Sequence, residues 1–493
     1  MKRFNLRGAW GYIIATIFLF IGILALFSAL WFRTVYGDLG FDSVFFTLFT
    51  YGGGVESSIV SSYLIRGLLP SVICCTLICF LIFFKPRKFK SKIYPFSKKI
   101  SFFICYFLSF ALFLSGTFIS NLSSKLISVV QLTTFFEQHY IAPENTKITF
   151  PTQKRNLIYI YLESMESTFL SKDQGGAMDK EIATELFNLA NQNVNFSHSD
   201  KVGGYRQLNG CQWTAASMVA HTTGIPLRQG KYTNIDFSNG NFLPKASSII
   251  KILNENGYYQ TLMVGSNSKY GNRSDFYNAQ GIDKIYDIDT AKSDGIVDED
   301  YFVWWGMEDK YLYQYAKQEL TEIAKKDEPF FFTMLTADTH FPQGYVCDLC
   351  QDASKSQYEN VISCAAHQVY DFVEWVKQQP FYQNTTIVIV GDHATMDNEY
   401  IVAANISDSE RHIYNCIINS AIDTKNTSHR TFTALDMFPT TLAAIGCTIE
   451  GDRLGLGTNL FSNTPTLTEE YDFDYVEKEI SKESPFYYST FYN

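Results

Sequence analysis

Three long apolar runs in the first quarter of the chain constrain its fold most strongly. They occupy residues 11–32, 67–84 and 100–120, and none contains a charged residue. About 20 apolar residues let a helix cross the hydrocarbon core of a bilayer. A cleaved signal peptide is the alternative for the first run, but it needs a short apolar core and a small-residue cleavage site, and neither is evident. The sequence therefore predicts a membrane domain, residues 1–125, with three transmembrane helices.

Basic residues around these runs predict their orientation. Lys2, Arg3 and Arg7 precede the first run, and seven lysines and arginines lie within 85–99, between the second and third runs. Because loops rich in Lys and Arg stay in the cytoplasm, we expect everything after about residue 125 on the opposite side of the membrane. Residues 43–55 are apolar but too short to cross, and we interpret them as an interfacial segment on the outer side.

The charge distribution divides the chain in the same way. The net charge is −10, but residues 1–130 carry 13 basic and 3 acidic residues, and the remainder carries 27 basic and 47 acidic residues. An acidic larger part argues against nucleic acid as a partner, because binding phosphate backbones requires a basic face.

Cysteines are numerous in the part expected outside the cytoplasm. An even number of cysteines in an oxidising compartment favours disulfides, but the sequence leaves open which cysteines pair. Cys347-x-x-Cys350 is alternatively half of a zinc site, but no second Cys-x-x-Cys or His pair follows at a suitable spacing, so a structural disulfide is favoured. The six are Cys211, Cys347, Cys350, Cys364, Cys416 and Cys447.

From residue 155 onward, short β-rich runs alternate with helical stretches. Nearly continuous apolar strands indicate a sheet covered on both faces, and alternation with helices indicates a mostly parallel α/β sheet. We expect a linker over 126–154, this α/β domain over 155–465 and an acidic, aromatic tail over 466–493. The predicted strands are 156–162, 259–264, 329–335, 385–390 and 413–418.

Ligand sites in such sheets lie beyond the carboxyl ends of the strands. Glu163 follows the first predicted strand, His340 lies shortly after the third, and Asp392 and His393 follow the fourth. Carboxylates with an imidazole suit a divalent ion such as Mn²⁺, Mg²⁺ or Zn²⁺. Each carboxylate alone could instead cap a helix or be an ordinary loop residue. The metal site is favoured because carboxylates and histidines follow three strands whose ends meet at one edge of the sheet.

A nucleophile is expected at Thr214. This threonine ends the glycine-containing segment 203–214 and precedes a helical pattern that Gly224 and Pro226 terminate. An ordinary N-cap is one interpretation. The other is that the helix N-terminus stabilises a phosphoryl group on the hydroxyl, with a neighbouring metal lowering the pKa of that hydroxyl.

These residues, in this order, resemble the sulfatase-like transferases of the alkaline phosphatase superfamily. The stretch Trp213–Ala220 followed by Gly224–Leu227 is similar to the phosphoglycerol transferases that decorate periplasmic glucans, with lipoteichoic acid synthases as relatives. The resemblance covers about residues 155–462. It implies an enzyme of the bacterial inner membrane that moves phosphoglycerol from phosphatidylglycerol to a periplasmic or cell-surface glycan.

The resemblance also implies roles for individual residues. Glu163, Thr214, Asp392 and His393 would bind one divalent ion, commonly Mn²⁺, and Thr214 would be the nucleophile. His340 would lie near the transferred phosphate and assist proton transfer or charge stabilisation. Arg273, in Tyr270-Gly-Asn-Arg, matches an arginine that contacts the glycerol phosphate; a surface salt bridge to Asp275 is the alternative for it. Lipoteichoic acid synthases have Trp at the position of Gly271, so that part of the pocket must differ.

Three other functions stay open at this point. A phosphoethanolamine transferase acting on lipid A or another glycan would share the nucleophile and the metal. A phosphatase or sulfatase is less favoured, because Cys211-Gln-Trp-Thr-Ala lacks the Pro/Ala and Arg that surround a formylglycine precursor. A non-enzymatic glycan-binding protein would require the metal-ligand pattern to be coincidental. The acidic tail is interpreted as packed on the domain or solvated, with no assigned role.

Overall fold

Helices form at all three apolar runs, in a computed structural model of the chain. The structure describes residues 6–37, 57–83, 98–128, 130–228 and 242–492. Within these residues, the helices long and apolar enough to cross a membrane are Trp10–Tyr36, Ser57–Phe83 and Lys99–Ile119. The second begins ten residues before the predicted run and includes Arg66, which is exposed. The interfacial segment 43–55, Lys2, Arg3 and most of the basic loop lie outside the described residues.

The membrane-type unit is made of α1 (Leu6–Tyr36), α3 (Ser57–Tyr63), a π-helical turn (Leu64–Leu68), α4 (Leu69–Phe83) and α5 (Lys98–Ile119). Glycines let α1 and α5 approach closely. A Cβ on Gly22 would lie 2.4 Å from the carbonyl oxygen of Ser109, and one on Gly116 would lie 2.8 Å from that of Ala25. Small residues are what membrane helices use for close backbone packing.

A second unit begins near Ser128 and continues to the end of the chain. Its core is a seven-stranded sheet of order β3-β8-β7-β2-β6-β4-β5. All five predicted strands are present within a residue of their expected bounds, and the sheet is parallel except that β8 and β3 run antiparallel to their neighbours. The strands are β2 (Asn156–Leu162), β3 (Gly204–Tyr205), β4 (Tyr259–Val264), β5 (Lys284–Tyr286), β6 (Phe330–Leu335), β7 (Thr385–Gly391) and β8 (Ile413–Ile418).

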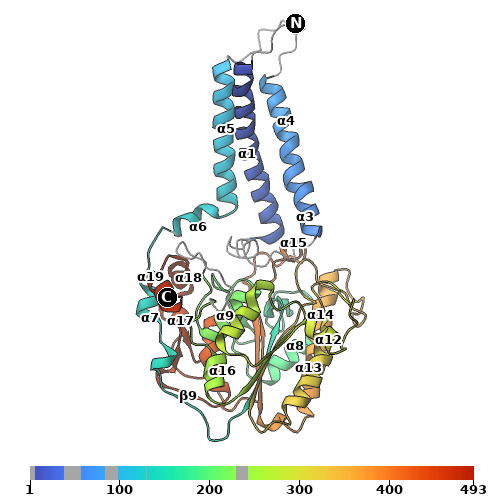
Figure 1. Ribbon diagram of the computed structural model, residues 1–493, viewed down its shortest axis with the longest axis vertical. Coiled ribbons are helices and arrows are strands. Elements are labelled where there is room, and N and C mark those ends of the chain that lie inside the picture. The colour runs from blue at the N-terminus through green and yellow to red at the C-terminus, as the bar shows by residue number, and fades with distance from the viewer. Residues whose placement is uncertain (1–5, 38–56, 84–97, 129, 229–241, 493) are drawn as a thin grey trace. The chain divides into compact units, whose positions relative to one another are not determined.

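Alternate residues of β2 feed two separate cores, one on each face of the sheet. Leu157, Tyr159 and Tyr161 join one core, and Ile158 and Ile160 join the other. Both faces are covered by helices, as the continuous apolar strands predict (Figure 1). The first core includes residues of α9 (Thr214–Thr223), α10 (Ile249–Glu255), α11 (Arg273–Gln280) and α16 (Met437–Ala444); the second includes residues of α8 (Thr184–Gln192), α12 (Ile288–Ser293), α13 (Asp309–Ile323), α14 (Gln357–Lys377) and α15 (Asn398–Ala403).

The predicted linker and the tail both pack on this unit. Residues 126–154 include the end of α6 (Leu122–Ser128), α7 (Phe135–His139) and β1 (Ile148–Thr149), which pairs with β9 (Thr448–Ile449). The tail forms α17 (Leu467–Tyr471), α18 (Phe473–Ser481) and α19 (Pro485–Phe491). Tyr487 is fully buried in the first core and donates a hydrogen bond to the carbonyl of Pro226 at 2.8 Å.

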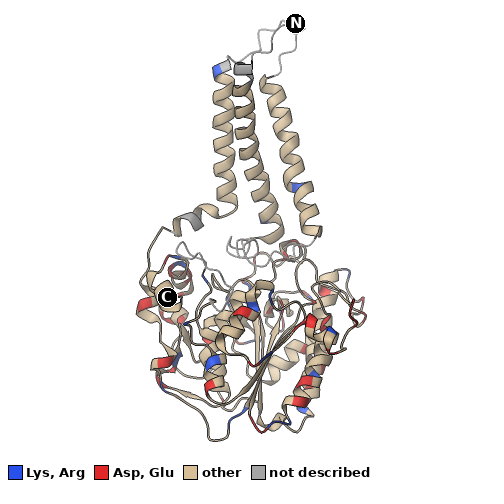
Figure 2. Cartoon of the chain, viewed as in Figure 1, with Lys and Arg blue, Asp and Glu red and all other residues tan. Residues whose placement is uncertain are grey.

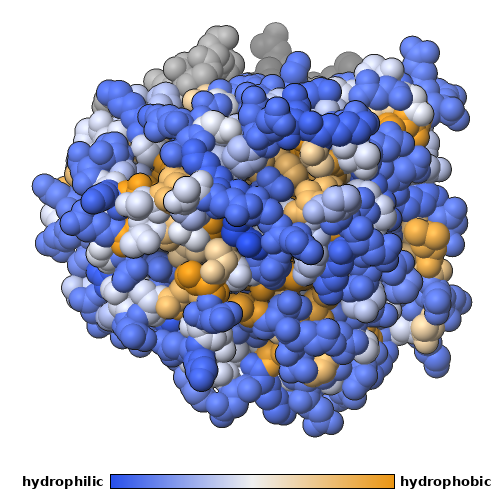
Figure 3. Space-filling model, turned by 90° about the horizontal axis from the view of Figure 1, so that it is seen from below, coloured by the Kyte–Doolittle hydropathy of each residue, from blue (hydrophilic) through white to orange (hydrophobic). Residues whose placement is uncertain are grey.

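Charge and hydropathy differ between the units. Figure 2 shows few charged residues on α1, α4 and α5 and many on the second unit. The face of the second unit in Figure 3 is largely hydrophilic, with apolar residues scattered over it. Such a surface is typical of a domain that folds in water.

Candidate active site

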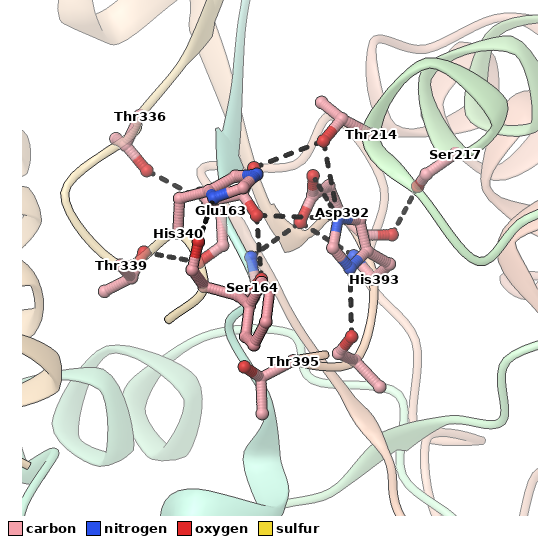
Figure 4. A network of polar contacts seen from close by, with 12 residues as sticks. Glu163, Ser164, Thr214, Ser217, Thr336, Thr339, His340, Asp392, His393 and Thr395 are labelled. Carbon is pink, nitrogen blue, oxygen red and sulfur yellow. Dashed lines mark hydrogen bonds and ion pairs between the residues drawn. The ribbon is translucent and has the colours of Figure 1, made fainter. Parts of the chain in front are cut away.

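Three adjacent parallel strands place polar side chains at one edge of the sheet. β2 is hydrogen-bonded to both β6 and β7, and all three run in the same direction. Glu163 directly follows β2, Asp392 and His393 follow β7, and His340 lies in the loop after β6. Figure 4 shows these side chains gathered around one point with Thr214, which comes from the start of α9. The structure thus brings together the residues that the strand-end argument singles out.

The hydroxyl of Thr214 lies between a carboxylate and an imidazole. It donates to Glu163 Oε2 at 3.2 Å and lies 3.3 Å from His393 Nε2. His393 Nε2 is in turn 3.5 Å from Glu163 Oε1 and 3.4 Å from Asp392 Oδ2. Thr214 is partly exposed whereas the other three are buried, so the hydroxyl is the member of the group that a substrate can reach.

Thr214 does not cap its helix. The N-cap residue is Trp213, whose backbone is extended, and Thr214 is the first helical residue of α9. Its hydroxyl contacts the carboxylate and imidazole across the site rather than the N–H groups of its own first turn. The N-cap interpretation of Thr214 is therefore wrong, although the expected helix start and the left-handed Gly224 at its end are confirmed.

The Asp392 carboxylate has one bonded and one unpaired oxygen. Oδ1 accepts hydrogen bonds from the backbone N–H groups of Ser164 at 2.7 Å and His393 at 2.8 Å. Oδ2 is buried without a hydrogen-bond partner. Burial and the neighbouring Glu163 raise the pKa of Asp392 to about 7. A buried, unpaired carboxylate oxygen is costly unless a cation or a proton compensates it.

The tautomer of His393 follows from its other ring nitrogen. Nδ1 lies 2.9 Å from the carbonyl oxygen of Ala394, which can only accept, so Nδ1 carries the hydrogen. In the neutral ring, Nε2 then directs a lone pair at the centre of the group, as in imidazole ligands oriented by a backbone carbonyl. Burial opposes the imidazolium form, but Asp392 and Glu163 raise the pKa of His393 above its ordinary value.

Glu163 is held ionised by its surroundings. Burial raises its pKa, but His340 and His393 and the hydroxyls of Ser164 and Thr214 outweigh that effect and lower it. Ser164 donates to Oε1 at 2.7 Å and has a positive φ of 52°. Backbone strain of this kind is common at functional sites.

These donors fit a divalent cation. One oxygen of Glu163, one of Asp392 and one nitrogen of His393 lie within 4.8 Å of one another, and all three residues are buried. Two carboxylates and a neutral imidazole are suitable ligands for Mn²⁺, Mg²⁺ or Zn²⁺. The unpaired Asp392 Oδ2 and the Nε2 lone pair of His393 are the features that a cation in this position would satisfy.

His340 and Arg273 lie close enough to influence Glu163. His340 Nδ1 is 2.7 Å from the carbonyl of Phe341, and its ring packs on Trp305 with centroids 4.5 Å apart. Arg273 is only 5% exposed, so the alternative of a surface salt bridge is wrong. Its guanidinium donates to the carbonyls of Tyr270 and Asn267 and to the hydroxyl of Ser266. Burial lowers the pKa of Arg273, while Tyr270 and Glu163 oppose that shift.

Residues outside the metal-ligand group hold the loop after β7 in place, and the sequence alone does not indicate them. The Ser217 hydroxyl, three residues into α9, donates to the carbonyl of Asp392. The buried carboxylate of Glu166 accepts a hydrogen bond from Thr395 N–H at 3.0 Å and two from the guanidinium of Arg411. Their contacts join residues distant in sequence, so no local pattern indicates them.

The expected structural disulfides are absent from the described residues, where every cysteine is a free thiol. The sulfurs of Cys347 and Cys350 are 3.6 Å apart, and a third sulfur, that of Cys364, is 3.7 Å from Cys347. The preference for a disulfide overlooked Cys364 because it lies on a helix, outside the Cys-x-x-Cys spacing.

Comparison with known families accounts for this arrangement. The sulfatase family model matches residues 155–447, more than half of the chain. The chain belongs to the sulfatase family. The matched segment includes the strands and loops that carry Glu163, Thr214, His340, Asp392 and His393.

Among sequence relatives of this sulfatase-family chain are two proteins called phosphoglycerol transferase I. Those from Citrobacter koseri and Escherichia coli are each 30% identical over 269 residues, which cover 53% of this chain and 33% of the relative. The chain thus aligns with about a third of the length of these curated relatives.

Solved structures share its fold. An alkaline phosphatase superfamily protein from Vibrio parahaemolyticus has a TM-score of 0.52 at 20% identity, covering 71% of this chain and 82% of that one. The integral membrane lipooligosaccharide phosphoethanolamine transferase A from Neisseria meningitidis has a TM-score of 0.51 at 13% identity, covering 89% and 84%.

Proposed function

We propose that this protein is a membrane-anchored transferase that moves a phosphoglycerol group from phosphatidylglycerol to a hydroxyl of a periplasmic or cell-surface glycan. The observation that carries the proposal is the position of the Thr214 hydroxyl, partly exposed and in contact with both Glu163 and His393. The relatives named phosphoglycerol transferase I support the identity of the transferred group.

The reaction consists of two displacements at phosphorus. Thr214 Oγ1 forms a bond to the donor phosphate while the bond from phosphorus to the diacylglycerol oxygen breaks, and the threonine proton ends on the released diacylglycerol. A glycan hydroxyl then attacks the phosphoglyceryl-threonine, the bond to Oγ1 breaks, and the proton returns to Thr214. Two displacements retain the configuration at phosphorus.

The chain's own groups prepare Thr214 for both steps. Its position at the start of α9 directs free backbone N–H groups and the positive end of the helix dipole at the phosphoryl group. The Thr214 hydroxyl donates a hydrogen bond to the Glu163 carboxylate. This bond orients the lone pairs of Thr214 Oγ1 toward the incoming phosphorus. His340, whose Nδ1 is engaged with Phe341, would accept or donate a proton at Nε2.

Glu163, Thr214, Asp392 and His393 would hold the divalent ion, for which Mn²⁺ is our first choice. Such an ion, when bound, lowers the pKa of the threonine hydroxyl and stabilises charge on the non-bridging phosphate oxygens.

Donor recognition would rest on local groups. The acidic unit gains nothing from general attraction to anionic lipid, so Arg273 must contribute the specific positive charge. Its guanidinium is buried near Glu163, and its hydrogen bonds go to neutral oxygens. Three apolar helices keep the enzyme at the bilayer that contains the donor, which raises the local donor concentration. We place the second unit on the extracytoplasmic side of the bacterial inner membrane.

Incubation of the purified full-length protein and Mn²⁺ with each lipid separately tests the choice of donor. Phosphatidylglycerol should release diacylglycerol, whereas phosphatidylethanolamine should release none. Release from phosphatidylethanolamine alone would make the protein a phosphoethanolamine transferase. Turnover of a soluble phosphoester, with no diacylglycerol from either lipid, would make it a hydrolase.

A further inference from the structure

Three cysteines outside the candidate active site converge at one point. Cys347 and Cys350 lie in the loop after β6, and Cys364 lies on α14. Their sulfurs are all within 4.8 Å of one another, and Cys347 and Cys364 are buried. The loop is the same one that carries His340, so this cluster joins that loop to a helix covering the sheet.

The separations of the sulfurs correspond to shared coordination of one ion. Cys347 Sγ is 3.6 Å from Cys350 Sγ and 3.7 Å from Cys364 Sγ. A disulfide would bring two sulfurs to about 2.05 Å. Two thiolates bound to one tetrahedral Zn²⁺, with bonds of about 2.3 Å, place their sulfurs about 3.8 Å apart. The Cys347 sulfur lies at nearly this distance from both other sulfurs, as expected for three thiolates that bind one metal ion.

Donors around the cluster are positioned to stabilise thiolates. The Gln368 side-chain amide, one turn after Cys364 on α14, donates to Cys364 Sγ at 3.4 Å. Hydrogen bonds from outer residues orient and stabilise metal ligands in proteins.

An oxygen ligand is also close by. Carboxylate oxygens of Glu308 and Asp348 lie within 4.8 Å of the Cys347 sulfur and of one another. Lys310 now bridges the two carboxylates, at 3.1 Å from Glu308 and 2.7 Å from Asp348. Glu308 is buried whereas Asp348 is exposed, so Asp348 can turn toward the sulfurs without leaving solvent.

We propose that Cys347, Cys350 and Cys364 bind one Zn²⁺ ion, with a water molecule or the Asp348 carboxylate completing a tetrahedral site. Three thiolates select Zn²⁺ over Mn²⁺ or Mg²⁺, which prefer oxygen. As each Zn–S bond forms, the proton of any protonated thiol is released to solvent. The ion fastens the loop that carries His340 to α14. It is distinct from the ion proposed beside Thr214, where no sulfur ligand is present among the described residues.

Cobalt substitution separates the two sites, because only thiolate ligands give a sulfur-to-cobalt charge-transfer band. The full-length protein, purified in detergent and treated with Co²⁺, should show that band. The zinc-loaded protein should contain a zinc ion that is still bound in the Asp392→Asn variant. Cys350→Ser should abolish the band. Cys416→Ser, which alters another buried cysteine of the same unit, should retain it.

Wild-type protein supplies a readout that does not depend on how the variants fold. Alkylation and peptide mapping should find Cys347, Cys350 and Cys364 protected by zinc and alkylated after chelation. A disulfide between any two of them, or no charge-transfer band in the wild type, would overturn the proposal. Retention of the band in folded Cys350→Ser would also overturn it.

Discussion

Replacing Arg411 by alanine leaves the buried carboxylate of Glu166 without its cation. The Glu166 side chain is 0% exposed, and Arg411 Nε donates to its Oε2 at 2.8 Å while Nη2 donates to its Oε1. Arg411 also donates to the carbonyl of Thr395 at 2.9 Å, and Thr395 N–H donates to Glu166 at 3.0 Å. The pair therefore fastens the loop that carries Asp392 and His393.

Removing one partner of such a buried pair costs about 3–5 kcal/mol, because the remaining charge stays desolvated. A unit of roughly 370 residues unfolds with an entropy of about 0.8 kcal/mol per kelvin. We therefore expect Arg411→Ala to lower the melting temperature of the second unit by roughly 4–6 °C. The double variant Arg411→Met/Glu166→Leu should lose less than half as much, because no unpaired charge remains.

Thermal unfolding of the purified full-length protein, followed by tryptophan fluorescence in detergent, measures these shifts. Arg206→Ala is a matched control, because that arginine pairs with the exposed carboxylates of Glu410 and Asp474 and should change the melting temperature little. A drop of less than about 1 °C for Arg411→Ala, or a double variant less stable than the single one, would refute the reasoning.

Three further predictions concern pH, packing and metal binding. Burial lowers the pKa of His221 to about 3. Because this histidine becomes protonated near pH 6.5 in the unfolded chain but stays neutral in the native state, the free energy of unfolding should fall by about 2 kcal/mol by pH 5. His221→Gln should flatten that decline in acid unfolding scans, and exposed His367→Gln should not. A Cβ on Gly391 would lie 1.8 Å from the Met165 carbonyl oxygen, so Gly391→Ala should lower the free energy of unfolding by about 3 kcal/mol or more. A variant that melts at the wild-type temperature would contradict this. Mn²⁺ should raise the melting temperature of the wild type but not of Asp392→Asn, as a titration would show.

The sequence predicts the fold well where apolar patterning is strong. The five long strands are nearly continuous apolar runs, and the first residue after β2 and after β7 supplies a candidate ligand. Strands β3 and β5 have two and three residues, too few to form a recognisable pattern. Likewise, the charged Arg66 lies just before the apolar run 67–84 at which the second long helix was expected to begin, although the helix begins at Ser57.

Long-range contacts were beyond sequence reasoning. The Cys347–Cys364 proximity joins a loop to a helix, and the Glu166–Arg411 pair is separated by most of the second unit. Thr214 illustrates a different limit. Its location at a helix start was predictable from the helical pattern and Gly224, but whether its hydroxyl caps the helix or faces Glu163 depends on the tertiary structure.

The mass of the peptide that contains Thr214 tests the central claim most directly. After brief incubation with Mn²⁺ and phosphatidylglycerol, without an acceptor glycan, this peptide should gain one glycerophosphoryl group on Thr214, in step with diacylglycerol release. Thr214→Ala should form no adduct and release no diacylglycerol, and its unchanged melting temperature would show that it is folded. Diacylglycerol release by Thr214→Ala at the wild-type rate, or an adduct on another residue, would contradict the account.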